Sequence, residues 1–92
     1  MIARIATEGQ YRLEGDHLDH LNELDGRVVD AVSRGDDAGF RQLFAELLTY
    51  IRQNGQRLAD AELASSDVIL PPPDTTLADA RELFKGEGVL PG

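Results

Sequence analysis

Residues 36–53 read DDAGFRQLFAELLTYIRQ, and this stretch decides the class of fold. Its large apolar residues recur three or four positions apart, which is the spacing of side chains on one face of an α-helix. They are Phe40, Leu43, Phe44, Leu47, Leu48 and Ile51. Asp36 or Asp37 can begin the helix and Gly55 follows its end, so the sequence predicts one amphipathic helix that runs to about Gln53.

A pattern of the same spacing precedes this helix and predicts another between His17 and Ser33. Asp16 is its expected N-cap, and Gly35 can end it in the left-handed conformation. Gly26 weakens the helix by roughly 1 kcal/mol relative to alanine, so we expect it to mark a close helix crossing. Because about three residues join the two helices, they should fold back as an antiparallel pair with their apolar faces on a common partner.

That partner is expected to be a sheet that begins with a β-hairpin. Met1–Ala6 and Gln10–Leu13 are short extended runs on either side of residues 7–9, a turn that includes a glycine. Side chains alternate between the two faces of a strand, so Tyr11 and Leu13 share one face of the second run. This strand should therefore be half buried.

The C-terminal part predicts one more strand and one more helix. Asp67–Leu70 is a compact apolar run that ends at three prolines, residues 71–73. Because proline cannot donate a hydrogen bond to a ladder, this run is predicted as a strand whose far end lies at a sheet edge. Thr75 or Thr76 can cap a short helix over Leu77–Phe84.

The sequence alone does not determine the structure of two segments. Gln56–Ser66 allows an extended stretch followed by a helical turn about Ala59–Leu63, and Val89–Gly92 either docks or frays. The chain is therefore predicted to be a single α+β domain over residues 1–92. Its elements are an N-terminal β-hairpin, an antiparallel helix pair, a third strand and a short C-terminal helix.

Composition narrows the classes of function. The 92 residues include 17 acidic and 9 basic side chains, for a net charge of -8, and no cysteine. A disulfide scaffold, a cysteine zinc site and a thiol nucleophile are excluded. The basic residues are spread along the chain and do not supply the positive patch that nucleic acid or an anionic lipid surface requires. No apolar run approaches the roughly 20 residues of a membrane span, and the expected location is the cytoplasm.

The sequence offers little that is typical of catalysis. It has no glycine-rich phosphate loop and no serine set beside a plausible base, so we expect neither an enzyme nor a cofactor. One cluster has metal-like spacing, because His17 and His20 are three apart with Asp16 and Glu23 nearby. The alternative interpretation is a solvated helix start, where acidic residues are favoured by the helix dipole.

Asn22 and Asp25 form a polar pair on or beside the apolar face of the first predicted helix. At 100° per residue Asp25 falls within the arc of the leucines and valines, and Asn22 lies just beyond it. Buried polar groups need partners, so the pair either fixes the packing or takes part in recognition. The aromatic and leucine stripe of the second helix is expected to be core, although any uncovered part would form a docking or dimer surface.

Three phrases together resemble the PspAA family of PspA-associated proteins. They are the opening MIARIATEGQYRL, the helix phrase HLDHLNELDGRVVDAV, and the ending SDVILPPPDTTLADARELFKGEGVLPG. The resemblance covers essentially the whole chain. It implies a small cytoplasmic companion of PspA, the coiled-coil, membrane-associated protein of the phage-shock envelope stress response, with no enzymatic activity and no cofactor.

The resemblance also identifies candidate interface residues. It includes the phrase with Asn22 and Asp25 and the pair Pro71 and Pro72, which become the candidate partner-binding or interface residues. It does not feature His17 or His20, which disfavours a metal site. A chain of net charge -8 could engage a basic helical stretch of a membrane-bound partner and leave lipid contact to that partner.

The leading hypothesis is thus a protein interaction module that binds or regulates PspA. The alternatives are a ligand or metal-ion sensor that uses the His17 and His20 face, and a purely structural homodimer.

Overall fold

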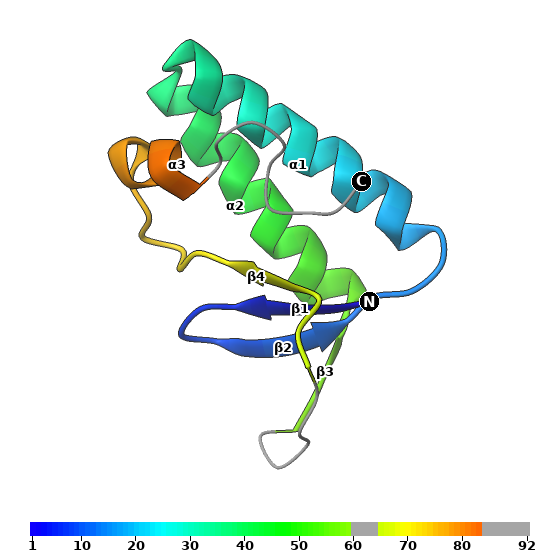
Figure 1. Ribbon diagram of the computed structural model, residues 1–92. Coiled ribbons are helices and arrows are strands. Elements are labelled where there is room, and N and C mark those ends of the chain that lie inside the picture. The colour runs from blue at the N-terminus through cyan, green and yellow to red at the C-terminus, as the bar shows by residue number, and fades with distance from the viewer. Residues whose placement is uncertain (60–64, 84–92) are drawn as a thin grey trace.

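The computed structural model describes residues 1–59 and 65–83 (Figure 1). The elements in chain order are β1 (Ile2–Ile5), β2 (Gly9–Arg12), α1 (His17–Arg34), α2 (Asp37–Asn54), β3 (Gln56–Arg57), β4 (Val68–Leu70) and α3 (Leu77–Leu83). The predicted hairpin, helix pair, edge strand and short C-terminal helix are all present, so the α+β fold is confirmed. The strand β3 is an addition, formed by the start of the segment that the sequence left open.

The two long helices begin and end largely as their cap residues predict. Asp36 accepts a hydrogen bond from the amide of Gly39 at 3.0 Å, which satisfies one of the free N–H groups at the start of α2. Gly35 ends α1 with φ 69°, a left-handed conformation that costs glycine little. Asp16 stands at the predicted N-cap position of α1, but its side chain forms no capping hydrogen bond. Its backbone is already helical (φ -63°, ψ -20°), whereas N-cap residues are typically extended.

Gly26 does not mark a helix crossing, so that prediction is wrong. It is exposed on α1, and a Cβ added to it would meet nothing within 4 Å. The helices α1 and α2 pack through the leucine and valine side of α1 instead. Gly26 therefore lowers the stability of the helix, and no close contact in the structure requires a glycine there.

The sheet has the strand order β3-β2-β1-β4. The hairpin strands β1 and β2 are antiparallel, with Ala3 opposite Tyr11, and β3 adds antiparallel to β2. At the other edge β4 is parallel to β1, with Ala3 opposite Val68, and Pro71 follows it directly. The predicted helical turn about Ala59–Leu63 lies, apart from Ala59, outside the described residues.

The short helix α3 begins at the predicted cap. The hydroxyl of Thr76 accepts a hydrogen bond from the amide of Asp79 at 3.2 Å, and Ala80 is buried. The prediction extended this helix to Phe84, which lies outside the described residues, as does the apolar segment Val89–Gly92.

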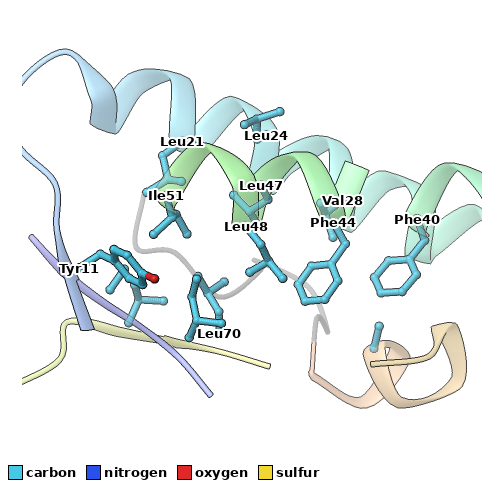
Figure 2. Packing of buried hydrophobic residues seen from close by; sticks show 14 of the residues in the cluster. Tyr11, Leu21, Leu24, Val28, Phe40, Phe44, Leu47, Leu48, Ile51 and Leu70 are labelled. Atoms are coloured by element: carbon cyan, nitrogen blue, oxygen red, sulfur yellow. The ribbon is translucent and has the colours of Figure 1, made fainter. Parts of the chain in front are cut away.

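The helix pair covers one face of the sheet, and the core lies between these two layers (Figures 1 and 2). Figure 2 shows Tyr11 and Leu70 on the sheet side directed towards Ile51 and Leu48 of α2. Ile5, Leu13, Leu47, Ile51 and Leu70 are all 0% exposed. The residues of the predicted apolar stripe on α2 thus form the centre of the core, except Leu43, which is partly buried.

None of the helices in the described part of the chain is long and apolar enough to cross a bilayer.

Candidate functional site

The four interface candidates from the sequence lie in two parts of the fold. Asn22 is exposed on α1, whereas Asp25, one turn later, is only 5% exposed and lies among buried leucines and valines as the helical wheel predicts. Pro71 is buried directly after β4, and Pro72 is half-buried. The carbonyl of Pro72 accepts hydrogen bonds from the amide and the hydroxyl of Thr75, at 3.1 and 2.7 Å. Asn22 is therefore the most accessible of the four, and Pro72 takes part in the turn that leads to α3.

Both histidines of α1 gather around Tyr50 near the end of α2. His17 Nδ1 and the Tyr50 hydroxyl form a hydrogen bond of 2.9 Å, and the rings of His20 and Tyr50 lie with their centroids 4.6 Å apart. The antiparallel course of the helices brings the start of α1 beside the end of α2, which places this cluster between them. Within residues 1–59 and 65–83, no group of three or more His, Cys, Asp or Glu side chains gathers as a metal site.

We expect Tyr50→Phe to lower the free energy of unfolding by about 1 kcal/mol, because it removes the hydrogen bond to the half-buried His17 and keeps the ring. Urea denaturation of the single variants Tyr50→Phe and His17→Ala and of the double variant measures this coupling. If the two single effects simply add in the double variant, the hydrogen bond contributes nothing to stability.

An open groove of about 480 Å³ runs between α1 and α2 beside this aromatic cluster. Leu24, which is 4% exposed, lies in it, while His20, Tyr50, Gln42 and Glu46 also line it. The lining is more apolar than polar, and such a surface accepts an aliphatic or aromatic group better than a charged one.

The hairpin is tied to the helix layer by an ion pair between Glu8 and Arg52. The Arg52 guanidinium donates two hydrogen bonds to the Glu8 carboxylate, at 3.0 and 2.7 Å. The hydrogen bond to Glu8 raises the pKa of Arg52, with partial burial acting against it and the charge of Glu8 adding to it. Because both side chains are partly exposed, solvent screens the pair, which stabilises the fold by about 1 kcal/mol at most.

The face of the sheet turned away from the helices carries a feature that the sequence interpretation missed. Arg4 and Arg12 are both exposed on this face, and Ile69, opposite Arg4 in the register, is 63% exposed. Arg4 lies opposite Gln10, two residues before Arg12, so the two arginines are diagonal neighbours. They are eight positions apart in the chain, and only the hairpin register brings them together.

Part of this face is covered by the chain itself. Gln10 lies on it and is nevertheless 8% exposed, because its side chain donates a hydrogen bond of 2.8 Å to the Ser66 hydroxyl. Leu58, whose amide donates to the Gln10 carbonyl, is 5% exposed. Ile69, Arg4 and Arg12 on this face stay exposed, and we call these three residues the open sheet face.

Comparison with known proteins identifies a family. A family model described as PspA-Associated protein, PspAA, matches residues 1–92. No curated protein and no solved structure matches the chain. The match includes the helix phrase with Asn22 and Asp25 and the prolines after β4, and it spans every element described above. The chain therefore belongs to the PspAA family of PspA-associated proteins.

Proposed function

We propose that this protein binds PspA directly and modulates it in the phage-shock envelope stress response, without catalysing a reaction. The observation that carries the proposal is the match of the PspA-Associated family to all 92 residues. A family defined by association with PspA is expected to supply a partner surface, and the fold offers two. One is the groove between α1 and α2, and the other is the open sheet face.

The local chemistry supports a binding role. Three groups of the kind that a hydrolase would use have structural partners. His17 and Tyr50 share a hydrogen bond, the Ser66 hydroxyl accepts one from Gln10, and the Thr76 hydroxyl caps α3. Groups held in this way fix the shape of a surface. In this proposal the protein works in the cytoplasm and reaches the inner face of the membrane through PspA.

The test is co-elution of the full chain with PspA from the same genome, by size exclusion with light scattering at low and moderate salt. We expect a complex at low salt that weakens as salt rises, chiefly through slower association, because charged groups at a surface steer the encounter. The chain alone is the control and gives its own oligomeric state. If both proteins are folded and no complex forms at micromolar concentrations, the proposal is overturned.

A further inference from the structure

The charges of this protein are segregated between its strands and the rest of the chain. The four described strands contain three arginines, Arg4, Arg12 and Arg57, and no acidic residue, so all 17 acidic side chains lie outside them. In a chain of net charge -8 the sheet is thus a positively charged layer.

The arginines of the sheet differ from those of the long helices in their partners. Each of the four arginines in α1 and α2 has a carboxylate within 3.2 Å: Arg27, Arg34, Arg41 and Arg52. Arg57 donates to the backbone carbonyl of Glu8 at 2.9 Å. Arg4 and Arg12 form no ion pair with the described residues. Asp67 lies beside Ile2, one residue before the Ala3 and Val68 pair, and its exposed carboxylate accepts a hydrogen bond of 2.7 Å from the Ile2 amide. It is a single negative charge next to the two arginines.

An exposed aliphatic residue stands beside these two charges. Ile69 is the large hydrophobic residue that is most exposed in the described part of the chain, and β-pairing places it directly opposite Arg4. A single exposed isoleucine is ordinary on a protein surface. Beside two arginines that form no ion pair within residues 1–59 and 65–83, it adds an apolar contact to two cationic donors.

We infer that the open sheet face, Ile69, Arg4 and Arg12, docks an acidic amphipathic helix of a protein partner. Four strands spaced about 4.8 Å apart give a face roughly 20 Å wide, of which the chain covers part, and a helix is about 10–12 Å in diameter. The diagonal separation of Arg4 and Arg12 is about 7–8 Å. Carboxylates at positions i and i+4 of a helix are neighbours about 6 Å apart and can therefore reach both guanidinium groups.

The net charge of -8, which on sequence alone favoured a basic partner helix, does not oppose an acidic helix at short range on this face. The Debye length is about 8 Å at physiological salt, so at contact the open sheet face outweighs distant carboxylates. The net charge affects the rate of encounter more than the stability of the docked pair.

An anionic lipid surface is a poorer occupant than a protein helix. An arginine near an anionic leaflet strengthens binding roughly fivefold, and lipid-binding segments use clusters of about four to eight such residues. Two arginines on a chain of net charge -8 fall short of that. The inference rests on the proposed function only in taking the partner helix to be part of PspA.

The first test compares affinities for PspA. We expect Arg4→Gln with Arg12→Gln to weaken binding at least tenfold at low salt. The matched control is Arg27→Gln with Arg34→Gln, which makes the same change in charge on exposed arginines of α1 and should stay within twofold. Ile69→Thr keeps the strand and should weaken binding several-fold. Equal affinity of the Arg4 and Arg12 variant and the unmodified chain would overturn the inference and leave the proposed function standing.

The second test does not depend on PspA. The isotope-labelled chain is titrated in NMR with a helical peptide that carries Glu at i and i+4 and Leu at the intervening apolar positions. We expect amide shifts in β1, β2 and β4 that the Arg4 and Arg12 variant loses and that a Gln version of the peptide does not cause. Shifts confined to α1 and α2, or none, would overturn the inference even if PspA binds.

Vesicles of phosphatidylglycerol and phosphatidylcholine (1:3) provide the lipid comparison. Vesicle binding that the Arg4 and Arg12 variant loses, without peptide binding, would assign the open sheet face to lipid and overturn the inference. If the peptide shifts map to the strands but PspA does not bind, the docking surface stands and the proposed function fails.

Discussion

We expect Phe40→Ala to lower the free energy of unfolding by about 3–5 kcal/mol. Phe40 lies in the first turn and a half of α2, is 0% exposed, and stacks on Phe44 with ring centroids 5.4 Å apart. Truncation removes the apolar ring from the core, leaves a cavity and ends this aromatic contact (Figure 2). A domain of this size is stable by about 5–14 kcal/mol, so the variant loses a large part of its stability.

Urea denaturation followed by circular dichroism measures this loss. Phe40→Leu is the matched control, because it keeps most of the apolar volume and should cost under about 1.5 kcal/mol. If Phe40→Ala shifts the free energy of unfolding by less than about 1 kcal/mol, Phe40 is not part of a closed core and the packing of α2 on the sheet is different from that described.

Phe40 illustrates which part of the fold the sequence determines. Helical spacing of large apolar residues is a local signal, so the limits of α1 and α2 and the buried face of α2 were predicted closely. The cap at Asp36 and the left-handed Gly35 are also local, and both were confirmed. The helical backbone at Asp16 was not predicted, because the turn after β2 continues directly into the first turn of α1.

The sheet was less predictable, because its pairing is between distant residues. The edge strand at Val68–Leu70 was recognised from its apolar run and the prolines after it. Its parallel register with β1 and the two-residue strand β3 depend on contacts that no local pattern encodes. The prediction of a close helix crossing at Gly26 was wrong for a similar reason. A glycine leaves room for another element to pack closely, but the sequence does not identify that element.

The candidate site residues also differ in whether a local pattern or the pairing of distant strands determines their positions. The helical wheel placed Asp25 in the apolar arc correctly, since this needs only the helix period. The spread of arginines along the chain suggested no positive patch, yet the hairpin register makes Arg4 and Arg12 diagonal neighbours. Alternation within each run already puts these two on the face opposite Ala3 and Tyr11. The missing information was the register and the absence of ion pairs with the described residues.

Gly55→Ala should destabilise the protein by about 1–3 kcal/mol, in contrast to the small gain that such a change usually gives. Gly55 links α2 to β3 at an ordinary extended backbone (φ -86°, ψ 150°), so its dihedral angles do not require glycine. Glycine is required instead because neighbouring atoms approach it closely. A Cβ here would lie 2.6 Å from the Ile51 carbonyl oxygen and 2.9 Å from the Tyr11 Cβ, and neither atom is the flexible end of a side chain. The end of α2 would have to move away from β2.

Gly26→Ala is the matched control, because it adds the same methyl group to an exposed helical position with open space around it. It should raise the free energy of unfolding by about 0.5–1 kcal/mol, since alanine favours the helix and restricts the unfolded chain. Urea denaturation of both variants side by side should therefore give shifts of opposite sign. If both substitutions stabilise the protein, α2 does not approach β2 as closely as the structure shows. The hairpin would then have room to move against the helix layer, and the register that brings Arg4 and Arg12 together would be held by strand pairing alone.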